Sequence, residues 1–182
     1  TIDFVTIATA GDATDFGNLT VSRRNVTGVS SPTRSVFLGG RTSGDTASDV
    51  LDFVTIASTG NATDFGNDTG AAHSIGAGFQ NSTRSGAAGG SGNTQQIDFI
   101  TTQSSGVSND FGDLTDGRGG NGGASSPTRG LFCGGYKSPS STAYNNIEFV
   151  TTSTTGNAAD FGDLTVARNF FGAASNAVRA VI

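Results

Sequence analysis

The stretch TIDFVTIATAGDATDFGNLT (residues 1–20) returns three times, as VLDFVTIASTGNATDFGNDT (50–69), QIDFITTQSSGVSNDFGDLT (96–115) and NIEFVTTSTTGNAADFGDLT (146–165). Each copy opens with alternating polar and apolar side chains, which indicates a strand buried on one face. Two phenylalanines stand at the same places in every copy: Phe4 and Phe16, Phe53 and Phe65, Phe99 and Phe111, Phe149 and Phe161. A fixed internal repeat defines the architectural unit of a chain.

The segments between the copies repeat as well. An arginine in each unit (Arg34, Arg84, Arg129 and Arg179) begins a short apolar stretch, which ends in a Gly-Gly pair in the first three units. One unit therefore reads as four short strands: NVTGVS (25–30), SVFLGG (35–40), LDFVTIAS (51–58) and a strand entered through DFG. Four short antiparallel strands in a repeat of this length match a propeller blade better than a solenoid rung.

We therefore predict an all-β fold, a β-propeller of about four four-stranded blades in a single domain, 1–182. Three blades are expected at 21–69, 70–115 and 116–165, and the fourth is composite, combining 1–20 with 166–182. In this composite blade the strand at 2–7 lies beside the strand ending at Ile182, and closure removes open sheet edges. An excerpt of a larger ring, or blades pooled between two chains, remain alternatives.

Composition limits the classes of partner. The net charge is −5 and Lys and Arg together number 10 without forming a run, which argues against nucleic-acid binding. No apolar run approaches the roughly 18 residues that span a bilayer, so membrane insertion is not expected. Cys133, the single cysteine, stands in GLFCGG and reads as a buried strand residue without a disulfide partner.

The order arginine, apolar strand, Gly-Gly, variable loop, aromatic strand and second aromatic resembles a kelch repeat, with phenylalanine at both aromatic positions. The phrases IDFVTIATAGDATDFGNLTVSR (2–23) and SSPTRSVFLGG (30–40) resemble repeats of virion structural proteins from tailed phages that infect marine cyanobacteria. This resemblance covers essentially the whole chain. It implies a virion or extracellular component, a fibre or another appendage, which contacts other virion proteins and host surface polysaccharide.

The repeated polar residues are interpreted as structural. DFG also occurs in the kinase metal-binding triplet, but the other kinase motifs are missing, so here Asp should tighten a turn, Phe should pack and Gly should leave room. The repeated arginines could bind an anionic ligand, since guanidinium groups suit carboxylates and phosphates. We favour the alternative, in which each pairs with a repeated aspartate on the same or the next blade. The residues concerned are Arg34, Arg84, Arg129 and Arg179, with Asp15, Asp64, Asp110 and Asp160.

Ligand recognition is expected where the units differ. The loops from Gly-Gly to the next aromatic strand vary in length and chemistry, and variable loops on a rigid scaffold carry binding functions. Among them, YKSPSSTAYNN (136–146) contains both tyrosines of the chain. Aromatic rings beside polar groups suit sugar contacts, so Tyr136, Lys137 and Tyr144 are the candidate ligand-binding residues. An ordinary solvated loop is the alternative interpretation.

No catalytic, metal or cofactor site is predicted. His73 is the single histidine, so neither a metal cluster nor a Ser-His-Asp arrangement is expected around it. Copper oxidase chemistry, which some kelch propellers carry, needs more His, Cys and Tyr ligands than this chain offers. The chain is thus expected to be non-enzymatic; a general carbohydrate- or protein-interaction propeller outside any virion is the alternative function.

One unit departs from the framework within its expected core. The second unit has Ala87 where the others have Phe37, Phe132 and Ile182, and it has Phe79 where Val29, Ala124 and Ala174 stand elsewhere. We expect Phe79 to fill the space that Ala87 leaves, because core volume tends to be conserved.

Overall fold

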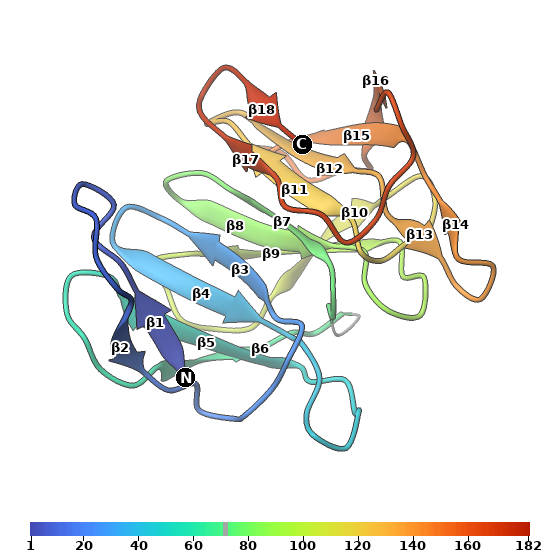
Figure 1. Cartoon of the computed structure of the whole chain (residues 1–182). Coiled ribbons are helices and arrows are strands. Elements are labelled where there is room, and N and C mark those ends of the chain that lie inside the picture. Colours follow the sequence, from blue (N-terminus) through green and yellow to red (C-terminus); the bar gives the residue numbers. More distant parts are fainter. Residues whose placement is uncertain (71–72) are drawn as a thin grey trace.

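The computed structural model describes residues 1–70 and 73–182 (Figure 1). Within these residues the secondary structure consists of strands and contains no helix, as predicted for an all-β chain. The same residues accordingly provide no helix that is long and apolar enough to cross a membrane.

Three antiparallel four-stranded sheets form the body of the molecule. The first sheet consists of β3 (Thr27–Ser30), β4 (Arg34–Leu38), β5 (Val50–Thr55) and β6 (Thr63–Asn67). The second consists of β7 (Ala77–Gln80), β8 (Arg84–Ala88), β9 (Gln96–Thr101) and β10 (Asn109–Asp113). The third consists of β11 (Gly122–Ser125), β12 (Arg129–Cys133), β15 (Asn146–Thr151) and β16 (Ala159–Asp163). The four strands predicted for one unit are therefore confirmed, and each sheet lies within one of the ranges 21–69, 70–115 and 116–165.

Two-stranded hairpins make up the remaining strands. The N-terminal hairpin pairs β1 (Ile2–Phe4) with β2 (Thr14–Gly17), and the C-terminal hairpin pairs β17 (Ala174–Ser175) with β18 (Ala180–Val181). A further hairpin, β13 (Tyr136–Lys137) with β14 (Thr142–Ala143), is inserted in the third unit.

The predicted composite blade is not formed. β1–β2 and β17–β18 belong to separate sheets, and β1 does not pair with β18. The reason lies in the stacking, because the N-terminal hairpin packs on the first sheet and the C-terminal hairpin packs on the third. The two hairpins therefore occupy opposite ends of the row of sheets (Figure 1). The closed four-bladed ring that we expected is not seen in this structure.

The DFG triplet creates a bulge that joins neighbouring sheets. Leu51 pairs with Gly66 and Asp52 with Asp64, so Phe65 is the extra residue of a β-bulge. Phe65 packs edge-on against Phe53 with ring centroids 6.0 Å apart. Gly66 has φ +142°, and a Cβ there would lie 2.1 Å from the carbonyl oxygen of Gly106 in the second sheet. Glycine is required at this position because the backbones of two sheets meet there.

The same contact is repeated along the row. The amide of Gly106 donates to the Phe65 carbonyl over 2.7 Å, and Gly60 and Gly156 donate equivalently to Phe16 and Phe111. At the opposite edges of the sheets, β3, β7 and β11 lie side by side. We call these three the inner strands and β6, β10 and β16, at the other edge of each sheet, the outer strands. A Cβ on Gly123 would lie 2.2 Å from the carbonyl oxygen of Gly78, so the inner strands also approach backbone to backbone. Both edges of each sheet are thus fixed by small residues and main-chain contacts.

The prediction that Phe79 fills the space left by Ala87 is wrong. Phe79 lies directly opposite Gly86 in the β7–β8 pair, and its ring packs between Phe111 and Phe132 on the face toward the third sheet. Ala87 belongs to the core cluster on the other face, toward the first sheet. Successive residues of a strand point to opposite faces, which is why the two side chains do not meet.

The volume of Phe79 is instead balanced across the strand pair. The corresponding cross-strand pairs are Val29 with Val36 in the first sheet and Ala124 with Leu131 in the third. The volume of the pair is thus divided differently in each sheet: two valines in the first, a phenylalanine with a glycine in the second, and an alanine with a leucine in the third.

We expect Phe79→Ala to destabilise the protein by about 3–5 kcal/mol, since the truncation opens a cavity against two other rings. Val29→Ala, at the same position of the first sheet, removes less buried surface and should cost roughly 2 kcal/mol. Urea unfolding of both variants measures the difference. A loss below about 1 kcal/mol for Phe79→Ala would show that its ring is not a core element.

Candidate functional site

A buried ion pair recurs in the segment that precedes the first strand of a sheet. In the first sheet, Arg23 Nη2 lies 2.7 Å from Asp52 Oδ2, and both side chains are fully buried. Arg23 also donates to the main-chain oxygens of Val50 and Phe37. The pair therefore ties the entering segment to the second and third strands of the sheet.

The third sheet repeats this arrangement with Arg118 and Glu148, which are 3.1 Å apart and buried. Arg118 donates to the Phe132 carbonyl, as Arg23 does to that of Phe37. Burial lowers the pKa of both arginines, while the facing carboxylates oppose this shift. One positive and one negative charge thus balance each other inside each of these two sheets.

In the second sheet the arginine position is held by His73. Its Nε2 lies 2.9 Å from Asp98 Oδ2 and 3.8 Å from Asp68 Oδ2, and all three side chains are fully buried. Asp98 occupies the position of Asp52 and Glu148, whereas Asp68 stands where the other units have leucine. The expectation that His73 is isolated is therefore wrong, because folding places it between two carboxylates.

Each member of this cluster has a further fixed contact. His73 Nδ1 lies 2.6 Å from the Gly89 carbonyl oxygen. The Ser108 hydroxyl donates to Asp68 Oδ1 over 2.5 Å, and Gln96 donates to Asp98 Oδ1 over 3.1 Å. Among the described residues, the buried Asp68 Oδ2 has no hydrogen-bond partner of ordinary geometry. We call Asp68, His73 and Asp98 the Asp-His-Asp cluster.

The environment shifts the pKa of two of these groups. Burial raises the pKa of the Asp68 carboxyl, and the opposing effects of His73 and Ser108 do not cancel this shift. Burial alone would lower the pKa of His73, but its hydrogen bond to Asp98 and the charge of Asp68 raise it above its ordinary value. The cluster has the ligand types and the separation, with all ligand atoms within 4.8 Å, that a metal ion needs.

The sequence contains a signal for this cluster that analysis of single motifs missed. When the repeats are aligned, three positions around the second sheet differ from their counterparts: leucine is replaced by Asp68 just after β6, arginine by His73 and alanine by Ser108. Asp68 and His73 are five residues apart, but Ser108 lies 35 residues further on, so only the alignment of the units connects all three positions.

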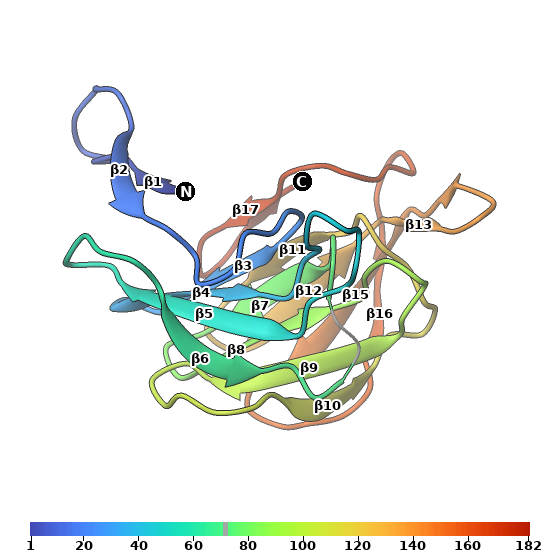
Figure 2. The same ribbon diagram turned by 90° about the horizontal axis from the view of Figure 1, so that it is seen from below.

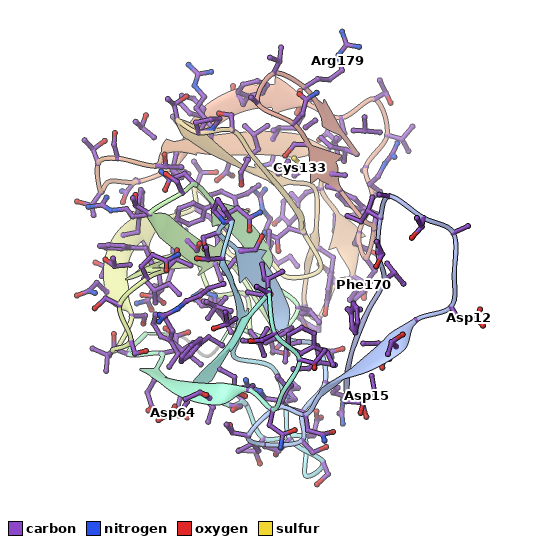
Figure 3. All side chains as sticks on the ribbon, turned by 90° about the vertical axis from the view of Figure 1, so that its left-hand side faces the viewer. Asp12, Asp15, Asp64, Cys133, Phe170 and Arg179 are labelled. Atoms are coloured by element: carbon purple, nitrogen blue, oxygen red, sulfur yellow. The ribbon has the colours of Figure 1, made fainter. Side chains whose placement is uncertain are left out.

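The repeated arginines do not form the ion pairs that we predicted. Within the described residues, Arg34, Arg84 and Arg129 instead place their guanidinium groups 4.4–4.7 Å from the ring centres of Phe53, Phe99 and Phe149. The repeated aspartates are exposed on the outer strands, and Figure 3 shows Asp15 and Asp64 across the molecule from Arg179. Each of these arginines begins the second strand of its sheet and lies over the aromatic ring of the adjacent third strand.

A double-mutant cycle tests this assignment. Arg84→Gln should cost about 1 kcal/mol through loss of the ring contact with Phe99. The loss should be the same in an Asp64→Asn background, with a coupling energy below about 0.5 kcal/mol in urea unfolding. A larger coupling would restore the ion-pair interpretation.

Tyr136, Lys137 and Tyr144 lie together on or beside the inserted hairpin, which projects from the body of the molecule (Figure 2). Lys137 Nζ and the Tyr144 hydroxyl each lie 2.9 Å from a different oxygen of Asp116. These two hydrogen bonds lower the pKa of Asp116. Tyr136 packs on Phe170 at 5.2 Å between ring centroids, and Phe170 is 65% exposed. We call these five residues the hairpin surface.

The hairpin surface is held on the scaffold from the neighbouring unit. The Asn93 amide group exchanges two hydrogen bonds of 2.7 Å with the main chain of Ser138. The variable loop of the sequence points to Tyr136, Lys137 and Tyr144 but not to Asp116 and Phe170, which come from other segments of the chain.

A polar groove runs across the inner strands of the three sheets and β17. Its volume is about 640 Å³. Equivalent residues of successive units bond across it: the Ser30 amide donates to Gln80, the Gln80 amide to Ser125 and the Ser125 amide to Ser175. Each of these side chains accepts a hydrogen bond from a main-chain amide of the adjacent inner strand. The polar groups on the floor of the groove therefore hold the sheets together.

Cys133 is a buried strand residue, as predicted. Burial raises the pKa of its thiol to about 11. Only the thiolate is a strong nucleophile, so the folded protein offers little reactivity at this position.

The folded chain should resist alkylation by iodoacetamide at pH 8, where a thiol of this pKa is roughly one part in a thousand thiolate. The unfolded chain in urea should react at the rate of a free cysteine. Mass spectrometry of timed samples measures both rates. Equal rates in the two states would contradict the burial of Cys133.

In comparisons with known proteins, no protein-family model matches the chain, and no curated protein does. The structure defines its class as an all-β protein of antiparallel four-stranded sheets that follow the internal repeat.

Proposed function

We propose that the sheets are kelch-like propeller blades and that the chain is a non-enzymatic structural component of a phage fibre or appendage. In this proposal the hairpin surface contacts host surface polysaccharide. The phage assignment rests on the sequence resemblance, which covers essentially the whole chain and is carried by phrases such as those at 2–23 and 30–40. The binding role rests on one observation, the exposed aromatic and polar groups on a hairpin that interrupts the repeated framework.

The division between framework and hairpin supports the binding role. The repeated phenylalanines, the bulge glycines and the buried Arg23 and Arg118 make contacts within or between sheets. The β13–β14 hairpin adds nothing to the ladder of the third sheet, which runs β11–β12–β15–β16 without it. An element that projects from a rigid scaffold and is not needed for its pairing is suited to recognition.

The geometry of the hairpin surface suits a sugar. The tilted rings of Tyr136 and Phe170 offer an apolar surface for the C–H face of a pyranose. Lys137, Asp116 and Tyr144 form a hydrogen-bonded group nearby that offers donors and acceptors to hydroxyls. Because Asp116 holds both partners in place, little side-chain freedom remains to be lost on binding.

Phe170→Ala should weaken binding to host surface polysaccharide about tenfold or more, if this ring is a main contact. A glycan array with host polysaccharides, followed by titration of the strongest hit, measures the change. Ile7→Ala is the matched control, because Ile7 is 99% exposed and lies in the N-terminal hairpin, away from the hairpin surface.

Equal loss in both variants would assign the binding to general hydrophobic contact. An array without any hit would leave a purely structural role for the chain and would contradict the hairpin surface as a receptor contact. Thermal unfolding of both variants should match that of the parent chain, since neither side chain is buried.

A further inference from the structure

We propose that the Asp-His-Asp cluster is a structural binding site for one divalent metal ion, with Zn²⁺ as the best-suited ion. The ligand atoms would be His73 Nε2, Asp98 Oδ2 and Asp68 Oδ2. Three observations carry this proposal: the charge of the cluster, its hydrogen bonds and the distances between its ligand atoms.

The charge balance differs between the sheets. The first and third sheets each bury one arginine with one carboxylate, Arg23 with Asp52 and Arg118 with Glu148. Beside the second sheet, two carboxylates are buried around a single imidazole: Asp98 from β9 and Asp68 from the segment that follows β6. Metal binding requires a neutral histidine and two ionised carboxylates. In that state the cluster carries two negative charges, and a divalent cation would restore the neutrality seen in the other two sheets. Buried charges are normally paired or bound to metal.

The hydrogen bonds around the cluster are those of a metal site. Ligating histidines usually donate their second nitrogen to a carbonyl or carboxylate, which leaves the first nitrogen free for the metal. His73 Nδ1 meets the Gly89 carbonyl in this way. Ser108 and Gln96 orient Oδ1 of Asp68 and Asp98. Each carboxylate therefore has one oxygen fixed by the protein and its Oδ2 directed toward His73 Nε2.

The one proposed ligand atom without a hydrogen-bond partner among the described residues is Asp68 Oδ2. It is buried and has no hydrogen-bond partner of ordinary geometry among the described residues, although the nearby Gly70 amide acts to lower the pKa of the Asp68 carboxyl. It lies 3.8 Å from His73 Nε2, which is beyond hydrogen-bond distance. An unsatisfied buried carboxylate oxygen is costly. A metal ion between Asp68 and His73 would satisfy it.

The distances fit a small ion. Zn²⁺ bonds to nitrogen and oxygen are about 2.0–2.2 Å, so ligand atoms of a tetrahedral site are roughly 3.4 Å apart. The observed separations from His73 Nε2, 2.9 Å and 3.8 Å, lie on either side of this value. Small side-chain adjustments would equalise them. A nitrogen and two carboxylate oxygens are also ligands that Zn²⁺ accepts.

The test begins with the 182-residue chain treated with EDTA and then given Zn²⁺ alone. Because the three ligands are buried, Zn²⁺ is added both to the folded chain and during refolding from urea. After dialysis, elemental analysis should find one zinc per chain, and Tm should rise by roughly 5–10 °C. His73 is the single histidine, so ¹⁵N NMR of labelled histidine should show one imidazole whose Nε2 signal shifts while Nδ1 stays protonated.

The matched control is the double variant Asp68→Leu with His73→Arg, which gives this cluster the residues found at the equivalent positions beside the first and third sheets, Leu19 with Arg23 and Leu114 with Arg118. This variant should fold without metal, and its Tm should respond to neither Zn²⁺ nor EDTA. Asp68→Asn, which keeps the side-chain shape, should lower zinc affinity at least tenfold and serves if the double variant does not fold.

Zinc uptake below one tenth per chain in both loading protocols would overturn the proposal, as would equal uptake by the parent chain and the double variant. A zinc-independent Tm together with a doubly protonated imidazole at pH 7 would also overturn it, and would assign the cluster to a buried ion triad. None of these outcomes depends on glycan binding by the hairpin surface.

Discussion

The remaining structure depends on a buried side chain, Arg23, His73 or Arg118, that lies just before the first strand of each sheet and contacts a carboxylate of the third strand. In the first sheet, Arg23 meets Asp52 and two main-chain oxygens and so holds the loop before β3 against β4 and β5. Removing one partner of such a buried pair typically costs about 3–5 kcal/mol, because the other charge is left uncompensated. The same segment also carries the contact to the next sheet, since the Gly40 amide donates to the His73 carbonyl and the Gly90 amide to that of Arg118.

Two further contacts make this arrangement repeatable. At the outer edge the DFG bulge buries a phenylalanine and brings the backbones of two sheets together at its glycine. At the inner edge, small residues allow neighbouring strands to approach closely. Each sheet therefore depends on its neighbours for the same few contacts, and a unit can change its side chains so long as the volume and charge at these points are preserved. Phe79 and Gly86 preserve the volume in this way.

The sequence was sufficient to predict the strands but not the partners of many side chains. Alternating apolar residues and invariant phenylalanines follow from local geometry, so the four strands of each unit were predictable. The ring contact of Arg84 was not, because a guanidinium suits a carboxylate and an aromatic face equally well until the register is known. Phe79 was assigned to the wrong neighbour for the same reason, since the strand pairing decides which face it occupies. The row of sheets with its two terminal hairpins depends on the angle between sheets, which no local pattern specifies.

The second unit shows why deviations from a repeat are more informative than its shared residues. Asp68, His73 and Ser108 replace residues of different chemistry at three separate positions, yet all three converge within hydrogen-bonding or near-contact distance. A single change to Asp68 would bury an unpartnered carboxylate beside an arginine pair that is already neutral. A single change to His73 would leave Asp98 with a cation whose charge depends on pH. The changes are compatible with a stable core only in combination, and together they create ligand chemistry that is not found in the equivalent clusters of the first and third sheets.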